Sequence, residues 1–511
     1  MPTQPAIFNV RDYGATGHKD DPAQAAIQQA IDACGQAGGG MVYVPPGDYT
    51  TGTLYLRSHV RLHVEAGATI YSSKDPATFT KRALFYAEDV NHITLEGRGT
   101  VDGQGEYLWK EMEFRDWYIY PNQLLAEKNG LSLMRSFPTD NSIGNLVLFI
   151  HCTDVRIENL AFLHSPSWTM HLFGLERLVI DGVYIYTSRR DGVWADGIDP
   201  DGCKDVRISN CTIDTGDDAL VFYSGHSYGP ARPCENITVT NCRLSSSSSA
   251  IKFCDGNEVA IRNVTIDNCV ITDSNRGIAF MVFDGGLIEN VVISNLTIAC
   301  RRHDWFWWGD GDPLHFNLIQ RSEIDANMDK AKEPPVGIMR NIILSNIIAH
   351  GPGPNRIHGH VNSMLENVTF ENVRLTVDGD PESPWKKAPN AITIDNARNF
   401  RLKDVEICWE TPSRDHWRSA LVVDNVQGLT LDGVSARQSP AGPEAPAVSF
   451  KNVVGAVVRN CLAQDGTGTF LQVTGAATRE VALWGNVWRP AQTHVAVAPE
   501  VKPDAVREGW A

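Results

Sequence analysis

Three acidic residues near the middle of the chain have the type and spacing needed for acid–base catalysis. Asp217 and Asp218 are adjacent, and Asp196 precedes Asp217 by 21 residues. Carboxylates that lie close together cannot all ionise at their ordinary pKa, so at least one should stay protonated at mildly acidic or neutral pH. A protonated and an ionised carboxyl together supply the acid and base that glycosidic-bond hydrolysis requires. In the alternative interpretation, the adjacent pair caps a turn and Asp196 is a solvated loop residue.

A repeat along the chain predicts how these residues are brought together. Asp205 to Cys211 is one copy: an Asn or Asp begins it, apolar residues alternate with polar ones, and Val and Ile are frequent. This pattern is typical of β-strands. The first apolar residue of successive copies stands at 155, 178, 206, 237, 264, 291, 342, 368, 400 and 429. Most steps are 23 to 32 residues long, and the 51-residue step after 291 indicates an insertion or an unrecognised copy.

Like residues recur at the same phase of the repeat, which predicts an all-β chain folded as a parallel β-helix, a solenoid whose coils stack their apolar faces. One phase is mostly Asn, and because Asn tolerates a left-handed backbone we expect a structural ladder of turns there. The members of this phase are Asn159, Asn210, Asn241, Asn268, Asn295, Asn346 and Asn372. The next phase holds Cys211, Cys242 and Cys269, which we interpret as inert buried thiols.

We expect a single β-helix domain over residues 1–511, with an N-terminal cap and first coils in 1–106 and a C-terminal cap and tail in 470–511. The N-terminal cap should be an amphipathic helix with Asp at its N-cap, Pro22 at its first position and a Gly run after it. Its buried face is predicted to be Ala26, Ile27, Ala30, Ile31 and Cys34. Insertions at 107–140 and 300–336, rich in Trp, Tyr and charge, should lie near the cleft.

Composition excludes several classes of protein and partner. A chain of 511 residues exceeds the size of a single growing core, which also favours a repeat architecture. The net charge of −16 argues against nucleic acid as a partner. No apolar run is long enough to predict a membrane span, and no secretory signal is visible, so with eleven cysteines we expect a cytoplasmic protein with reduced thiols. No Cys or His pair has metal-ligand spacing, so no metal or other cofactor is predicted.

The repeat phase also predicts what surrounds the acidic residues. Eleven and twelve residues after the first apolar position, successive copies hold Arg189-Arg190, Asp217-Asp218, Ser248-Ser249, Asn275-Arg276 and Arg302-His303. Neighbouring coils of a parallel stack lie about 4.8 Å apart. These pairs are therefore expected to line one mixed acidic and basic cleft.

The segments Ala195 to Cys203 and Thr215 to Ala219 resemble glycoside hydrolase family 28, the polygalacturonase-like enzymes. Ala37 to Tyr49 and Ser165 to Trp168 agree, and the resemblance covers roughly residues 8 to 320. It implies a right-handed parallel β-helix and inverting hydrolysis of pectic glycosidic bonds. By motif, Asp217 matches the general acid, and Asp196 and Asp218 match the pair that holds and deprotonates the attacking water.

The chain departs from the family pattern at several positions. The family's Asn-Thr-Asp is Trp194-Ala195-Asp196 here, and its Gly-His-Gly aligns with Ser248-Ser249-Ala250, so the amide and the His are lost. His226 and His303 are candidates to replace that His. Of the Arg-Ile-Lys motif the chain keeps Arg276 and lacks the Lys, and Lys252 is a candidate for the missing charge. These departures favour a divergent branch with a different substrate.

Other residues are candidates for binding the sugar. Arg276 is the first choice for a uronate carboxylate, because the planar guanidinium can bind it through two hydrogen bonds. The weaker candidates are Arg189, Arg190 and Arg302. His303 begins an aromatic run that includes Trp308, which either forms a wall against a sugar ring or packs the insertion onto the coils.

We therefore predict an inverting glycosidase that acts in exo mode on oligosaccharides of the pectin type, containing galacturonate or rhamnose. One alternative is a calcium-dependent polysaccharide lyase of the same fold, whose carboxylate cluster and Arg base these residues could imitate. The other is a non-catalytic glycan-binding β-helix, since the family His and Lys are missing.

Overall fold

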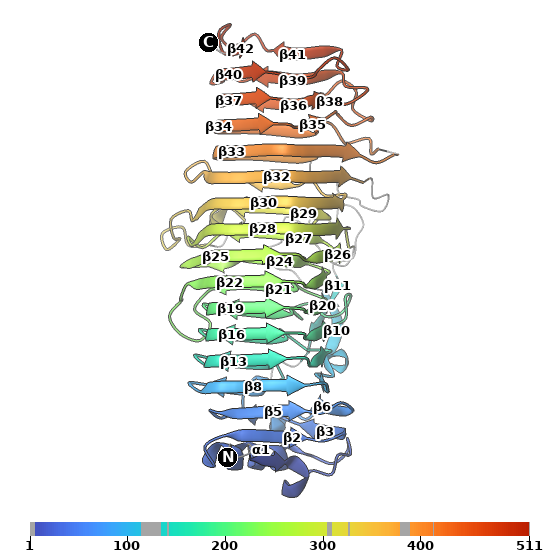
Figure 1. Cartoon of the computed structure of the whole chain (residues 1–511), viewed down its shortest axis with the longest axis vertical. Coiled ribbons are helices and arrows are strands. Elements are labelled where there is room, and N and C mark those ends of the chain that lie inside the picture. Colours follow the sequence, from blue (N-terminus) through green and yellow to red (C-terminus); the bar gives the residue numbers. More distant parts are fainter. Residues whose placement is uncertain are drawn as a thin grey trace, which may run out of the picture. The chain divides into compact units, whose positions relative to one another are not determined.

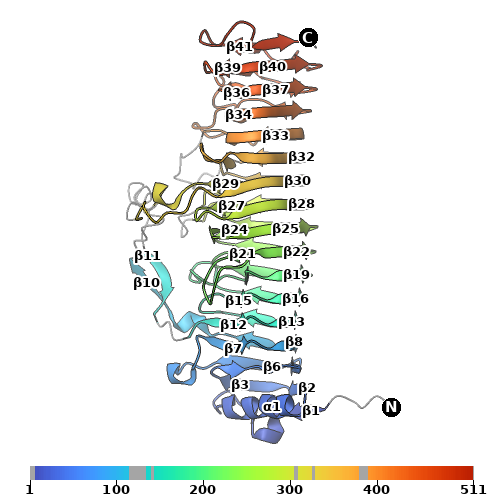
Figure 2. The same ribbon diagram turned by 90° about the vertical axis from the view of Figure 1, so that its left-hand side faces the viewer.

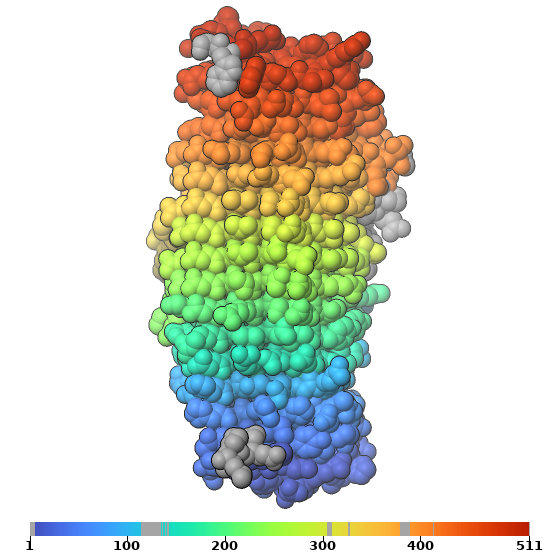
Figure 3. Space-filling model, viewed as in Figure 1, coloured from blue at the N-terminus to red at the C-terminus, as the bar shows by residue number. Residues whose placement is uncertain are grey.

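The computed structural model describes residues 6–113, 134–139, 143–303, 309–324, 328–378, 389–411 and 413–509. The chain divides into two compact units. Unit 1 comprises residues 1–115, 132–251 and 259–264, and unit 2 comprises 116–131, 252–258 and 265–511. In each unit successive turns of the chain are stacked, with parallel strands aligned from one coil to the next (Figure 1). The space-filling view shows the side chains of successive coils as closely packed layers within each unit (Figure 3).

Each coil of unit 1 contributes strands to three columns. The first column consists of β1 (Ile7–Asn9), β2 (Gly40–Val44), β5 (Val60–Val64), β8 (Asn91–Gly97), β13 (Thr153–Glu158), β16 (Glu176–Asp181), β19 (Lys204–Ser209) and β22 (Cys234–Thr240). The second consists of β4 (Leu54–Tyr55), β7 (Ala83–Glu88), β12 (Asn145–Ile150), β15 (Met170–Phe173), β18 (Ile198–Asp201) and β21 (Leu220–Ser224). The third consists of β3 (Gly47–Thr51), β6 (Ala68–Ser72), β9 (Thr100–Asp102), β14 (Ala161–Leu163), β17 (Tyr184–Tyr186), β20 (Thr212–Thr215) and β23 (Arg243–Ser246).

Unit 2 continues the same construction with longer strands. Its first column is β28 (Leu287–Cys300), β30 (Ile338–Gly351), β32 (Leu365–Val377), β33 (Ile392–Trp409), β34 (Leu421–Asp432), β37 (Val454–Arg459), β40 (Arg479–Trp484) and β42 (Val506–Glu508). Its other strands are β26 (Val270–Ser274), β27 (Arg276–Val282), β29 (Asp312–Leu318), β31 (Arg356–His358), β35 (Ser435–Ala436), β36 (Pro446–Lys451), β38 (Leu462–Ala463), β39 (Thr469–Thr474) and β41 (Thr493–Val497). Two strands, β24 (Ser249–Asn257) and β25 (Ala260–Asp267), contain residues of both units.

The strand registers confirm the parallel β-helix and the phase of the repeat. In unit 1 the predicted first apolar residues 155, 178, 206 and 237 pair in succession. In unit 2 the residues 291, 342, 368, 400 and 429 do the same. Because Val291 pairs directly with Ile342, the 51-residue step is a single coil that carries an insertion. Each of these side chains is almost fully buried, so the repeat forms the core.

The Asn residues form the expected turn ladder in both units. Asn241 donates to Asn210 at 3.3 Å in unit 1, and Asn346 donates to Asn295 at 3.0 Å in unit 2. Their φ angles lie near +55°, in the left-handed region that Asn tolerates. The structure adds a second ladder at the start of the strands, in which Asn341 donates to Asn290 at 3.0 Å. The eleven cysteines all lie within the described residues, and every one is a free thiol.

The N-terminal helix is present, but its predicted cap is wrong. Helix α1 (Gln24–Gln36) buries the five predicted apolar residues, and Gly38 beyond its end has a φ of +87°. Its N-cap is Ala23, which makes no side-chain capping hydrogen bond. The chain is still paired at Pro22, which bridges to Thr50, so the helix cannot begin there. Asp21 instead accepts a hydrogen bond from Thr16 at 2.8 Å.

Short 3-10 helices occur at Val10–Tyr13, Pro76–Thr78, Gly105–Tyr107 and Arg321–Glu323. In the described part of the chain, no helix is long and apolar enough to cross a membrane. Within the 107–140 insertion, β10 (Trp109–Glu113) and β11 (Met134–Pro138) form an antiparallel hairpin that projects from the coils of unit 1 (Figure 2).

Candidate active site

Asp196 and the Asp217-Asp218 pair lie on neighbouring coils of unit 1, as predicted. Strands β18 and β21 pair with Ile198 opposite Leu220, so Asp196 and Asp218 each precede the aligned pair by two residues. The backbone N–H of Gly197 donates to the carbonyl of Asp218 at 2.9 Å, which continues the alignment up to the acidic residues. The coil thus aligns on neighbouring turns two acidic residues that are 22 residues apart in the sequence.

The adjacent pair sits at a bend between β20 and β21. Strand β20 ends at Thr215, and the chain bends at Gly216 and Asp217 before β21 begins at Leu220. A side chain on Gly216 would place its Cβ 2.3 Å from the carbonyl oxygen of Ser188, so glycine is needed for this close approach. The bend interrupts the strand alternation that would otherwise point Asp217 and Asp218 to opposite faces.

Backbone amides orient the carboxylates of the pair. Asp217 accepts from the N–H of Trp194 at 3.1 Å and from the N–H of Asp218 at 2.9 Å. Asp218 accepts from the N–H of Ser249 at 2.8 Å. Asp196, Asp217 and Asp218 are 3%, 7% and 3% exposed, so these carboxyls are largely withdrawn from solvent and held in defined positions.

Serines in the aligned coil hold the bend in place. The hydroxyls of Thr215 and Ser246 donate to the carbonyl of Asp217 at 2.7 and 2.6 Å. Ser246 also accepts from the N–H of Ser248 at 2.8 Å. The serines at the position of the family His therefore support the pair, chiefly through the amide of Ser249 that binds Asp218. The sequence pattern gave no indication of this role.

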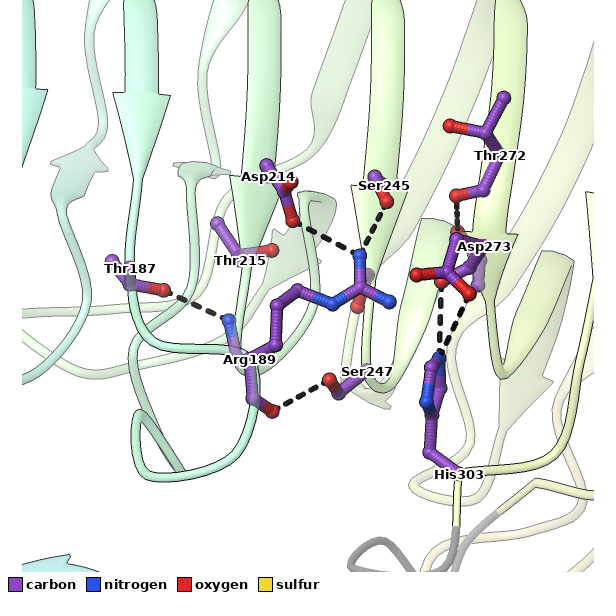
Figure 4. A network of polar contacts seen from close by, with 12 residues as sticks. Thr187, Arg189, Asp214, Thr215, Ser245, Ser247, Thr272, Asp273 and His303 are labelled. Carbon is purple, nitrogen blue, oxygen red and sulfur yellow. Dashed lines mark hydrogen bonds and ion pairs between the residues drawn. The ribbon is translucent and has the colours of Figure 1, made fainter.

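The two arginines that precede the pair by one coil behave differently. The Arg189 guanidinium lies 2.9 Å from Asp214 and contacts the hydroxyl of Ser245, while Ser247 donates to the Arg189 carbonyl at 2.6 Å (Figure 4). Arg189 therefore ties three coils together. Arg190 is a surface residue with a 69% exposed side chain, and its guanidinium lies 3.2 Å from Glu111 of the hairpin.

The β10–β11 hairpin packs against the loop that carries Asp196. The Phe137 ring contacts the Trp194 ring edge to face, with centroids 4.8 Å apart. Ser136 donates to Asp191 at 2.9 Å. The Trp109 indole donates to the carbonyl of Pro166 at 3.3 Å. The described part of the 107–140 insertion thus contacts the loop that carries Asp196.

A second aromatic group lies on the coil before Asp196. The N–H of Thr169 donates to the Asp196 carbonyl at 2.9 Å, and the neighbouring Trp168 stacks on Tyr223 with ring centroids 5.1 Å apart. His171, which also packs against Trp168, lies 3.3 Å from the buried Asp201 carboxylate. Sequence reasoning missed His171 and Asp201. The available signal was the alternation of acidic with apolar residues in β18, which is unusual for a buried strand.

Arg276 begins β27 in unit 2 and is 7% exposed. Among the described residues, its guanidinium makes one contact, from Nη1 to the sulfur of Met281 at 3.8 Å, and its Nε has no hydrogen-bond partner. A buried cation is costly without an anion nearby. Arg276 therefore has the capacity to bind an anionic group.

Lys252 is held by an ionic cluster of unit 2. Its ammonium lies 3.3 Å from Asp255, which also lies 3.5 Å from Arg321. Burial raises the pKa of Asp255, but Lys252 and Arg321 outweigh that effect and hold this pKa well below its usual range. Arg321 also contacts Asp284. Lys252 is therefore part of a structural ion cluster.

The remaining candidates are placed as follows. Arg302 and His303 are 4% and 1% exposed, and Arg302 contacts the carbonyl of His303. His303 Nε2 lies 3.0 Å from the carbonyl oxygen of Asp273 (Figure 4). His226 is an exposed residue of unit 1, and Trp308 lies outside the described residues.

Comparisons with known proteins place this arrangement in a family. Residues 34–298 match the profile of "Glycosyl hydrolases family 28". A "Probable polygalacturonase" of Vitis vinifera is 28% identical over 243 residues, which make up 43% of this chain and 45% of the relative. An "Exo-poly-alpha-D-galacturonosidase" of Dickeya chrysanthemi is 24% identical over 43% of this chain and 42% of its own length. The chain thus spans about half the length of the curated relatives it matches.

Solved structures show the same fold. An exopolygalacturonase from Thermotoga maritima matches with a TM-score of 0.59 and 20% identity, covering 79% of this chain and 93% of that one. A family 28 exopolygalacturonase of Yersinia enterocolitica matches with a TM-score of 0.59 and 18% identity, covering 84% and 79%. The profile match extends over more than half of the chain, and it includes the three aspartates and the strands that carry them. The chain belongs to glycosyl hydrolase family 28.

Proposed function

We propose that the chain is an inverting glycoside hydrolase that acts in exo mode on pectin-type oligosaccharides containing galacturonate or rhamnose. The observation that carries this proposal is the gathering of Asp196, Asp217 and Asp218 on neighbouring coils of unit 1. Family membership and the polygalacturonase names of the relatives support it.

In the proposed reaction Asp217 is the general acid. It donates its proton to the glycosidic oxygen as the bond from that oxygen to the anomeric carbon breaks. Asp196 and Asp218 orient a water molecule on the opposite face of the sugar and accept its proton as the new bond to the anomeric carbon forms. One proton enters the leaving group and one leaves the water, so the step is balanced. Because the water attacks the face opposite the leaving group, the configuration at the anomeric carbon inverts.

The hairpin beside the site supports the exo mode. An exo enzyme must block one end of its cleft, and β10–β11 is fixed to the loop that carries Asp196 through Phe137 and Ser136. The two solved structures compared above are both named exopolygalacturonases.

Arg276 supports a uronate as one of the sugars. Its buried guanidinium lacks a carboxylate partner among the described residues, and a carboxylate can accept two parallel hydrogen bonds from a guanidinium. We propose that the carboxylate of galacturonate binds this group.

Proton NMR of the first-formed product tests the mechanism. Purified protein is mixed with trigalacturonate and with a galacturonate–rhamnose tetrasaccharide, and the anomeric signals are followed before mutarotation. Inverted configuration and release of single terminal units are expected. Retention of configuration would refute the mechanism, internal cleavage of long polymer would refute the exo mode, and chelator-sensitive products that absorb in the ultraviolet would indicate a lyase.

A further inference from the structure

Trp194 has a conformation that is rare for an aromatic residue. Its φ is +70°, in the left-handed region, and it stands where the family motif has Asn, a residue that adopts this region readily. A bulky side chain at such a φ is strained, and strain of this kind concentrates at functional sites. The residue is nevertheless 38% exposed, so Trp194 is not a core residue that packing alone would explain.

Two contacts fix Trp194 beside the proposed acid. Its backbone N–H donates to Asp217 at 3.1 Å, and its side chain packs edge to face on Phe137 of the hairpin, with ring planes at 60°. Phe137 is 3% exposed and is therefore a buried support. The backbone of Trp194 thus serves the carboxylate, while its ring is held next to the site with part of its surface open to solvent.

We propose that the indole of Trp194 is a stacking surface for the pyranose ring next to the scissile bond. This inference rests on the proposed function and adds a binding residue to it. One face of a pyranose presents C–H groups, which pack against the flat apolar surface of an indole. Trp194 is two residues from Asp196 and is hydrogen-bonded to Asp217, so a sugar on this ring would have its glycosidic oxygen near the acid.

The replacement of the family's Asn by Trp changes which part of the sugar this position can bind. An amide would bind a hydroxyl or carboxylate of the sugar through hydrogen bonds, whereas an indole binds the carbon skeleton. The structure therefore assigns to Trp194 a role in selecting a sugar ring with an accessible apolar face, and this role differs from that of the family amide.

Binding measurements on an inactive background test the stacking role. Trp194→Asn removes the ring but keeps a residue that tolerates the left-handed backbone, and Trp194→Phe keeps an aromatic face. Each is combined with Asp217→Asn, and the affinity for trigalacturonate and for a galacturonate–rhamnose tetrasaccharide is measured by calorimetry. Trp194→Asn should weaken binding of at least one ligand about tenfold, and Trp194→Phe by less than about threefold. In the active protein, Trp194→Asn should raise KM more than it lowers kcat.

Trp484→Asn is the matched control, because it removes a 47% exposed indole from β40 of unit 2 and should leave affinity and KM unchanged. The inference is overturned if Trp194→Asn binds as tightly as the background while the wild type hydrolyses these ligands. If the wild type neither binds nor hydrolyses either ligand, the proposed function fails, and the stacking role fails with it. Circular dichroism spectra of all variants exclude misfolding as the cause of a loss.

Discussion

The paired aspartates of unit 1 and Asp255 of unit 2 are held by different kinds of partner. In unit 1, the carboxylates of Asp217 and Asp218 accept hydrogen bonds from backbone amides. In unit 2, Asp255 lies within ion-pair distance of both Lys252 and Arg321. The residue type is the same, and two cationic side chains lie beside Asp255, whose side chain is 15% exposed.

The kind of partner affects the pKa of a carboxyl and therefore whether the carboxyl can act as an acid. Two cations hold the pKa of Asp255 well below its usual range, so this residue stays ionised and contributes to structure. The backbone amides of unit 1 orient their carboxylates through hydrogen bonds. A general acid needs a proton to give at working pH, and the two cations of unit 2 prevent this for Asp255.

The largest expected effect is the loss of activity when the proposed general acid of unit 1 is removed. Asp217→Asn should lower kcat/KM on the hydrolysed oligosaccharide by about 10³-fold or more, because the leaving oxygen loses its proton donor. The two backbone hydrogen bonds reach different carboxylate oxygens, and the amide oxygen of Asn can accept only one of them, so Tm should fall by a few degrees while the fold is kept. Asp205→Asn, which extends the Asn ladder of unit 1, is the control and should keep full activity. Substantial residual turnover in Asp217→Asn would assign the acid elsewhere.

The second-largest effect is a loss of stability when the ion-paired aspartate of unit 2 is removed. Asp255→Asn should lower the free energy of unfolding by about 1 to 3 kcal/mol, because Lys252 and Arg321 lose a partly buried counter-charge while Arg321 keeps Asp284. Urea denaturation followed by circular dichroism measures this loss. Asp329→Asn, in an exposed pair with Lys332, should have no measurable effect. An unchanged midpoint for Asp255→Asn would show that the cluster is not a structural anchor.

Arg276 adds a third case to the comparison, because it is a buried cation without a carboxylate partner among the described residues. Arg276→Gln should raise KM for trigalacturonate about tenfold to a hundredfold, because a charged hydrogen-bond partner of the substrate is lost. The effect should shrink on methyl-esterified trigalacturonate, whose neutral ester cannot form the ion pair. Steady-state kinetics on both substrates provides the measurement, and equal losses on both would contradict carboxylate binding.

The smallest effect concerns a pair intermediate between the two groups, His164 and Asp102, whose ring nitrogen and carboxylate oxygen are 3.2 Å apart. Hydrogen bonding to Asp102 raises the pKa of His164. Burial raises the pKa of Asp102, but His164 outweighs this and lowers it overall. The His contribution is complete below about pH 6.5 and is lost as pH rises through the folded pKa, whereas the Asp contribution is lost as pH falls below about 3.8.

His164→Asn keeps a side chain that tolerates the local φ of +48° and removes the titrating group. Between pH 6 and 8, the wild type should lose up to about 1 kcal/mol of stability relative to this variant. Chemical denaturation at several pH values measures the difference. Parallel curves for the two proteins would show that the pair contributes nothing to stability.

The regular part of the molecule was predictable because its signal is repeated. Apolar positions such as Val291 and Ile342 recur at one phase, and each coil meets the same physical requirement as its neighbour. The acidic residues could be placed by the same phase, since alignment of coils fixes which residues meet. The N-cap of α1 could not, because the pairing of Pro22 with Thr50 joins residues distant in sequence.

Non-repeating contacts account for what the sequence did not reveal. The packing of Phe137 on Trp194, the pairing of His171 with Asp201 and the burial of Arg276 each depend on one local arrangement. No periodic pattern marks such contacts. The contacts that are particular to this chain therefore lie where the repeat is interrupted.

The amide ladder of unit 2 has a consequence for how this scaffold can change over evolution. Asn341 and Asn346 bond to Asn290 and Asn295 across 51 residues of intervening chain, with the same geometry that joins coils half as long. The pairing of the strands fixes only the two ends of the inserted segment, so the length and the composition of that segment are free to vary. New segments can therefore be inserted between two aligned strands, while the hydrogen bonds between these amides keep the neighbouring coils in register.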